Sequence, residues 1–147
     1  MIQRILVATD FSPSADEAWR CAVDLARSLD ADLHLVHVAM PMPADAPQKV
    51  DQDCEHAVAL AQRLLEERAA TATLGDRVKT VLRRGEPVQV LAAMARDENI
   101  DLVIVGTHQH HRAGDILVGS VAERLIRLAP CTVVVVKPRK TSVDTAS

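Results

Sequence analysis

The sequence has few aromatic residues and no excess of basic ones. Its 147 residues include one Trp, one Phe and no Tyr, and its formal net charge is −3. Proteins that bind nucleic acids usually present a basic face together with aromatic side chains that stack on bases. Because both features are lacking, the composition gives no reason to expect a nucleic-acid partner.

Cysteine is scarce as well. Cys21, Cys54 and Cys131 lie far apart, and no two of them have a Cys-x-x-Cys spacing. Neither a disulfide framework nor a zinc site is therefore indicated. We expect three reduced side chains that contribute mainly to packing.

Long hydrophobic runs are also lacking. The apolar run near the N-terminus stops before Asp10 and is too short for a signal peptide. The longest other run, residues 131–136, has the length of a strand, far below the roughly 20 residues of a membrane span. We therefore expect a cytoplasmic protein with no membrane contact. Its length and its 48% hydrophobic content suit one domain with an ample core.

Five short runs rich in β-branched residues alternate with helical patterns. They lie at about residues 4–9, 32–38, 78–82, 102–106 and 132–136. This alternation is typical of a parallel sheet with helices on both faces. The sequence thus predicts one α/β domain over residues 1–138, with a long loop at 39–50 and a disordered tail at 139–147.

Four helices are expected between these strands. Ser14 and Glu17 have the spacing of a capping box, which predicts that Ser14 caps the first helix. Its predicted apolar face repeats at helical spacing: Ala18, Cys21, Ala22, Leu25, Ala26 and Leu29. The second helix, at residues 51–70, is expected to bury Ala57, Val58, Ala61, Leu64 and Leu65. The third starts at Pro87, a favoured first helical position, and is expected to bury Val88, Leu91, Ala92 and Ala95. The fourth begins at Ser120 and ends before Pro130.

Two glycines and a serine flank the segment that follows the fourth strand. Gly106 ends that strand, and Gly119 and Ser120 open the last helix. A helix that starts in this way presents free N–H groups, and its dipole favours phosphate there. The spacing therefore predicts an anion site. The alternative is that Gly106 is an ordinary strand exit and Ser120 an ordinary helix start.

The same residues carry a family resemblance. Nucleotide-binding universal stress proteins have the signature Gly-x-x-Gly-x9-Gly-[Ser/Thr]. Here it stands as Gly106, two residues, Gln109, nine residues, Gly119 and Ser120. Gln109 therefore replaces the second glycine. The resemblance runs from Ile5 to Pro138 and includes the motif Ala-Thr-Asp-Phe-Ser at residues 8–12.

The resemblance implies a Rossmann-like, doubly wound, five-stranded parallel sheet in the order 3-2-1-4-5. In that order the chain reverses between the first and fourth strands, so a ligand crevice opens at their carboxyl ends. Asp10 follows the first of these strands and Gly106 ends the other. Asp10 and the predicted anion site, which the sequence indicates separately, would then meet at this crevice.

By the same resemblance, the ligand is ATP or AMP, and the protein is a stress-response regulator. Asp10 would lie beside the nucleoside, the backbone of Val38 would contact the base, and Mg or Mn would bind only through the phosphates. The whole predicted site is Ala8, Asp10, Val38, Val105, Gly106, Gln109, Gly119, Ser120 and Val121. For Asp10, the alternative is a role limited to capping the following turn.

Gln109 keeps other hypotheses open. A side chain at this position can block a close approach of phosphate, or can donate its amide N–H to it. The second hypothesis is a nucleotide-free, dimeric interaction module of the same family. The third, slow ATP hydrolysis or self-phosphorylation, has no marked nucleophile or base, so no catalytic residue is assigned.

The segment after Gly106 is also rich in histidine. His108, His110, His111 and Arg112 have no acidic or Cys partner at a recognised ligand spacing, so we expect a cationic rim or a solvated loop and no protein-bound metal. His34 and His37 are expected to be structural.

The last predicted strand suggests a homodimer. In residues 131–137, all positions from 132 to 136 are β-branched and no charge occurs before Lys137, yet the strand would lie at a sheet edge. Such an edge is prone to aggregation unless it is paired. Family members commonly pair it across a two-fold axis, which implies a homodimer through this strand.

Overall fold

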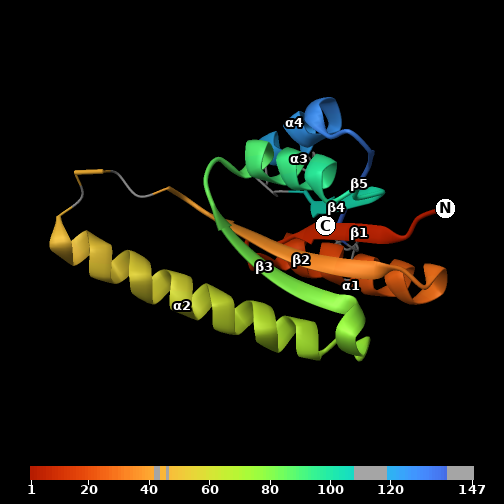
Figure 1. The fold of residues 1–147 in the computed structure, drawn as a ribbon, viewed down its shortest axis with the longest axis horizontal. Helices are drawn as coiled ribbons and strands as arrows, with labels where there is room; N and C mark the ends of the chain where they lie inside the picture. The colour runs from red at the N-terminus through yellow and green to blue at the C-terminus, as the bar shows by residue number, and fades with distance from the viewer. Residues whose placement is uncertain (42–43, 46, 108–118, 139–147) are drawn as a thin grey trace, which may run out of the picture.

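The computed structural model describes residues 1–41, 44–45, 47–107 and 119–138 of the chain. Along the chain (Figure 1) the elements are β1 (Arg4–Ala8), α1 (Pro13–Leu29), β2 (Asp32–Ala39), α2 (Gln48–Ala70), the 3-10 turn η1 (Gly75–Arg77), β3 (Val78–Arg84), α3 (Pro87–Asp97), β4 (Leu102–Gly106), α4 (Ser120–Leu128) and β5 (Thr132–Val136). The predicted tail at 139–147 lies outside the described residues.

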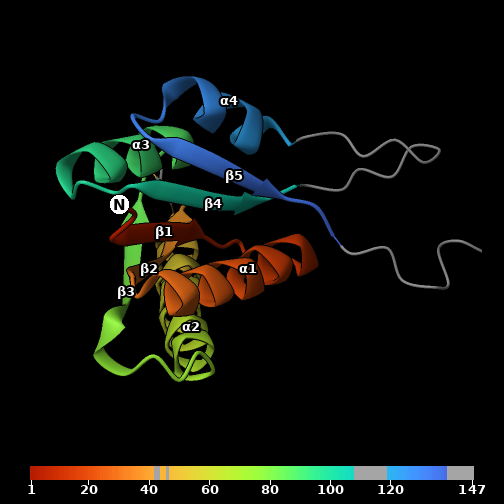
Figure 2. The same ribbon diagram turned by 90° about the vertical axis from the view of Figure 1, so that its right-hand side faces the viewer.

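The strands form one parallel sheet in the order β3-β2-β1-β4-β5, which confirms the predicted topology. Helices α1 and α2 cover one face, and α3 and α4 cover the other (Figure 2). In β4, residues 102–105 are all buried. Leu102 and Ile104 pack on the side of α1 and α2, and Val103 and Val105 on the side of α3 and α4. A central parallel strand covered on both faces must be apolar throughout, which is why its sequence is continuous rather than alternating.

The start of α1 differs from the prediction. Ser12 is the N-cap, and its Oγ accepts a hydrogen bond from the backbone N–H of Ala15 at 3.2 Å. Pro13 is the first helical residue, the position that proline favours. Ser14 lies inside the helix, so the prediction that it caps α1 was wrong. The predicted apolar face also reaches too far, because Leu29 at the end of the helix is exposed.

Helix α2 is longer than predicted and less buried. It begins at Gln48, and of its predicted core residues only Ala61 and Leu65 are buried, whereas Ala57 is exposed. Figure 1 shows why: the N-terminal half of α2 extends past the end of the sheet, where no strand lies beneath it. Helical periodicity identified the correct face of α2 but not the point at which the sheet stops.

Helices α3 and α4 agree better with their predicted limits. Helix α3 starts at Pro87 and α4 runs from Ser120 to Leu128, ahead of Pro130. In α3 the buried set includes Met94, whereas Ala92, which was predicted to be buried, is only half-buried. Within the described ranges, no helix combines the length and the apolar character that a membrane span requires.

Candidate functional site

A cleft opens at the carboxyl ends of β1, β2 and β4, where the strand order reverses. Its volume is about 170 Å³. This is the crevice in which open α/β sheets bind ligands. The walls are apolar and come from three strands and two helices: Ala8, Val36, Val38, Leu91, Val105 and Val121. The polar side chains of the lining come from the turn after β1, from α1 and from β2: Thr9, Asp10, Ser12, Ser14 and His37.

Most of the predicted site residues meet at this cleft. Its lining includes Ala8, Asp10, Val38, Val105, Gly106 and Val121. Gly119 and Ser120 are not in the lining but immediately precede Val121, at the start of α4. Gln109 lies outside the described residues, as do the histidines at positions 108, 110 and 111 and Arg112.

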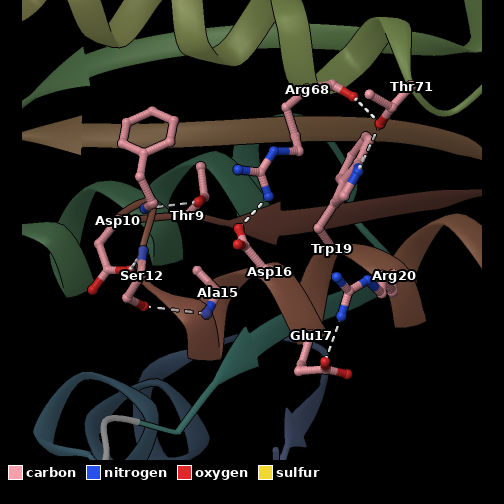
Figure 3. Close-up of polar contacts among 11 residues, drawn as sticks. Thr9, Asp10, Ser12, Ala15, Asp16, Glu17, Trp19, Arg20, Arg68 and Thr71 are labelled. Carbon is pink, nitrogen blue, oxygen red and sulfur yellow. Dashed lines mark hydrogen bonds and ion pairs between the residues drawn. The ribbon is translucent and has the colours of Figure 1, made fainter.

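The turn after β1, drawn in Figure 3, carries Asp10, which lines the cleft. The Phe11 N–H donates to Thr9 Oγ1 at 3.0 Å, and the Ser12 N–H donates to Asp10 Oδ1 at 3.0 Å. Phe11 has a φ of 63°, a conformation that costs energy in a bulky residue and that these two hydrogen bonds help to maintain. The carboxylate of Asp10 is exposed and preorganised, so a turn-stabilising role and a ligand-binding role are compatible.

His37 braces the same turn from β2, a role that the sequence did not reveal. Its Nδ1 lies 2.8 Å from the backbone oxygen of Thr9. A carbonyl oxygen only accepts, so Nδ1 carries the hydrogen of this bond. The imidazole ring also packs against Phe11, with ring centroids 4.8 Å apart. The bond connects the ends of β1 and β2 just before Asp10.

Gly106 is required by packing. A Cβ atom at this position would lie 2.4 Å from the backbone oxygen of Ser14 and 2.5 Å from its Oγ. The Ser14 hydroxyl donates to the backbone oxygen of Thr107, the next residue. Gly106 does not have a positive φ, so its backbone conformation alone does not require glycine. Glycine is needed here because the first turn of α1 approaches the end of β4 too closely for a side chain.

The N-terminus of α4 lies at the same end of the sheet as the first turn of α1, but it is capped differently. Gly119 is its N-cap, with φ −62° and ψ 156°, and no side chain caps it among the residues that the structure describes. The first N–H groups of a helix have no partner within it, and the helix dipole makes this end positive. An anion can take the place of the missing cap.

Helix α3 begins beside α4 and is capped by a side chain. Glu86 accepts a hydrogen bond from the Gln89 N–H at 2.9 Å and an ion-pair contact from Arg124 Nη1 of α4 at 2.7 Å. The Gln89 N–H, together with Arg124, lowers the pKa of the Glu86 carboxyl from its ordinary value. Glu86 is therefore ionised at neutral pH.

Comparisons with known proteins agree with this architecture. The sequence profile of the universal stress protein family matches residues 1–137. The chain belongs to the universal stress protein family. A putative universal stress protein of Staphylococcus aureus is 33% identical over 97% of this chain and 88% of its own length.

Solved universal stress proteins have the same fold as this one. The chain superposes on UspA from Lactobacillus plantarum with a TM-score of 0.80, over 91% of this chain and 97% of that one, at 24% identity. A universal stress protein solved in complex with cAMP gives a TM-score of 0.70 at 25% identity, over 93% of this chain and 98% of that one.

Metal and thiol chemistry have little support in the described part of this universal stress protein. There, no three His, Cys, Asp or Glu side chains are grouped so that they could hold a metal ion. Cys21, Cys54 and Cys131 are free and half-buried. Burial raises the pKa of the Cys21 and Cys131 thiols, which makes these two cysteines less reactive.

Proposed function

We propose that this universal stress protein binds an adenine nucleotide, ATP or AMP, in the cleft at the carboxyl ends of β1, β2 and β4. The proposal rests on three features at the same edge of the sheet: a cleft with apolar walls, an exposed carboxylate at Asp10, and the N-terminus of α4, which no side chain of the described residues caps. The apolar walls of the cleft suit a flat nucleotide base. Asp10 suits ribose hydroxyls, which donate hydrogen bonds, and the α4 terminus suits phosphate.

Each part of the nucleotide has a proposed contact. The base lies between Val38 and Leu91 and meets the backbone of Val38, with Ala8 and Val105 beneath it. The phosphates lie toward Gly106 and the N–H groups at Gly119, Ser120 and Val121. Gln109, which lies outside the described residues, is the remaining proposed phosphate contact. Mg or Mn accompanies the phosphates, because such ions are usually held by substrate phosphates with few protein ligands. The complex of a related universal stress protein with cAMP supports an adenine nucleotide as the ligand class.

We further propose that the protein acts in the cytoplasm as a stress-response regulator and as a homodimer through β5. In the described part of the chain β5 is an edge strand that pairs only with β4, and residues 133–136 are all half-buried valines. A second copy of β5, paired antiparallel, would satisfy the open backbone groups of this edge.

Replacing Val134 with Pro should disrupt the homodimer, because proline cannot donate a backbone hydrogen bond and disfavours a paired strand. Light scattering at tens of micromolar should show a dimer for the unmodified chain and a monomer for Val134→Pro. A substitution at Val23 in α1, Val23→Ala, is the control and should leave the dimer intact. An unmodified chain that is monomeric would contradict the dimer proposal.

A nucleotide-free interaction module is the second candidate, and one observation favours it. Gly106 is fully explained by its contact with Ser14, so this glycine would be retained even if no phosphate were bound. Gln109 in place of the family's glycine points in the same direction. This candidate predicts a folded dimer without measurable affinity for any adenine nucleotide.

Calorimetric titrations distinguish the two candidates. Asp10→Ala should weaken adenosine, AMP and ATP alike, because the carboxylate acts on the nucleoside. Ser120→Ala should weaken ATP more than adenosine, by roughly 0.5–1.5 kcal/mol for one neutral hydrogen bond. Gln109→Gly, which restores the glycine of the family signature, should strengthen ATP binding. Asp24→Ala, an exposed carboxylate elsewhere on α1, is the matched control and should change nothing.

One result would contradict the nucleotide site. If ATP, ADP and AMP all fail to bind both the natural protein and a folded Gln109→Gly variant, the cleft is not a nucleotide site. The interaction module would then be the better account.

A further inference from the structure

Glu86 lies at the junction of the two helices that cover the cleft. One carboxylate oxygen, Oε2, accepts the hydrogen bond from the Gln89 N–H and so caps α3. The other, Oε1, accepts from Arg124 Nη1, one turn into α4. A single side chain therefore caps the N-terminus of α3 and connects it to α4.

Both helices contribute walls to the cleft. Pro87 and Leu91 come from α3, and Val121 comes from the first turn of α4. Elsewhere α4 is held by the buried apolar side chains of Ala122 and Leu125. Apolar packing is not directional, so it resists separation of the helices more than a small rotation or slide. A charged hydrogen bond at a fixed position supplies the direction that apolar packing lacks.

We infer that the Glu86–Arg124 ion pair is a positioning device for the phosphate end of the site. It holds α4 against α3 so that the N-terminal N–H groups of α4 face the cleft. Glu86 also keeps the Arg124 guanidinium paired, so that it does not bind phosphate itself. The inference rests on the proposed nucleotide site and assigns the pair an effect on phosphate binding, without contact with the nucleoside.

The test uses three variants and two ligands. Glu86→Gln keeps an oxygen that can cap α3 but removes the charge that pairs with Arg124. Arg124→Gln removes the opposite partner, and Arg124→Lys retains the charge. ATP affinity should fall roughly two- to fivefold in Glu86→Gln and in Arg124→Gln, the range expected for an exposed ion pair. Adenosine affinity should be unchanged, the double variant should be no weaker than either single one, and Arg124→Lys should recover most of the loss.

Arg127→Gln is the matched control. It removes the same charge from the same helix and breaks the exposed pair of Arg127 with Glu123, whose atoms are 3.1 Å apart. It should leave ATP affinity unchanged, so a loss that appears in Arg124→Gln alone does not come from net charge.

Two results would overturn the inference while leaving the proposed function intact. Stronger ATP binding by Glu86→Gln would mean that Arg124, once released, binds phosphate itself. Unchanged ATP affinity in both Glu86→Gln and Arg124→Gln would mean that the pair serves only the fold. Absence of ATP binding by the unmodified chain would instead contradict the proposed function, and this inference would fall with it.

Discussion

Helices α1 and α4 both begin at the cleft, but their first turns are used in opposite ways. The first turn of α1 is closed: Ser12 caps it, and the Ser14 hydroxyl binds the end of β4 through Thr107. The first turn of α4 begins at Gly119, and no described side chain caps it. One helix start therefore locks the fold, whereas we propose that the N–H groups of the other bind an anion. Position at the crevice alone does not make a helix N-terminus a binding site.

The two glycines of the family motif differ in the same way. Gly106 has no room for a side chain, because the α1 backbone lies against it. Gly119 has φ −62°, which any residue adopts. The first glycine is therefore explained by stability, whereas the second is not required by its own backbone. Substitutions at these two positions separate stability from binding.

Gly106→Ala should have the largest effect. The new Cβ would meet the Ser14 backbone, which has no flexible end to move, so overpacking should lower the free energy of unfolding by about 3 kcal/mol. Urea unfolding measures this difference. Gly119→Ala is the matched control, and we expect a cost of no more than about 1 kcal/mol. Equal costs at the two positions would remove the distinction between them.

Gly119→Ser should have a smaller effect: it should raise the stability of the protein slightly and weaken its binding of ATP. A serine N-cap can accept a hydrogen bond from the first turn of α4, so stability should rise by a few tenths of a kcal/mol. The same hydroxyl occupies N–H groups that phosphate needs, so ATP affinity should fall while adenosine affinity is retained. Urea unfolding and calorimetry measure the two changes. ATP affinity that does not respond would argue that phosphate binds elsewhere.

Much of the fold could be predicted from the sequence because its signals are local. Continuous apolar runs mark the strands, and Pro87 marks the start of α3. Asp10 follows β1 and Gly106 ends β4, the two strands between which the chain order reverses. Their placement at one crevice therefore follows from topology. The start of α1 was misplaced although its signal was present: a serine directly before Pro13 is also a typical helix start.

The missed features depend on residues that are distant in the sequence. The contact of Gly106 with Ser14, the bond of His37 to Thr9 and the pair of Glu86 with Arg124 each join different elements. No local pattern encodes them. The exposure of Ala57 has a similar origin, because it depends on where the sheet ends beneath α2.

The most direct test of a nucleotide site is methyl NMR of the unmodified protein during titration with ATP. If ATP binds in the cleft, the methyl signals of Val38, Leu91, Val105 and Val121 should shift together and saturate with one dissociation constant. The methyl groups of Val23 and Val81, which do not line the cleft, should not move. Unchanged spectra up to millimolar ATP, or shifts confined to residues away from the cleft, would contradict a nucleotide site in the cleft.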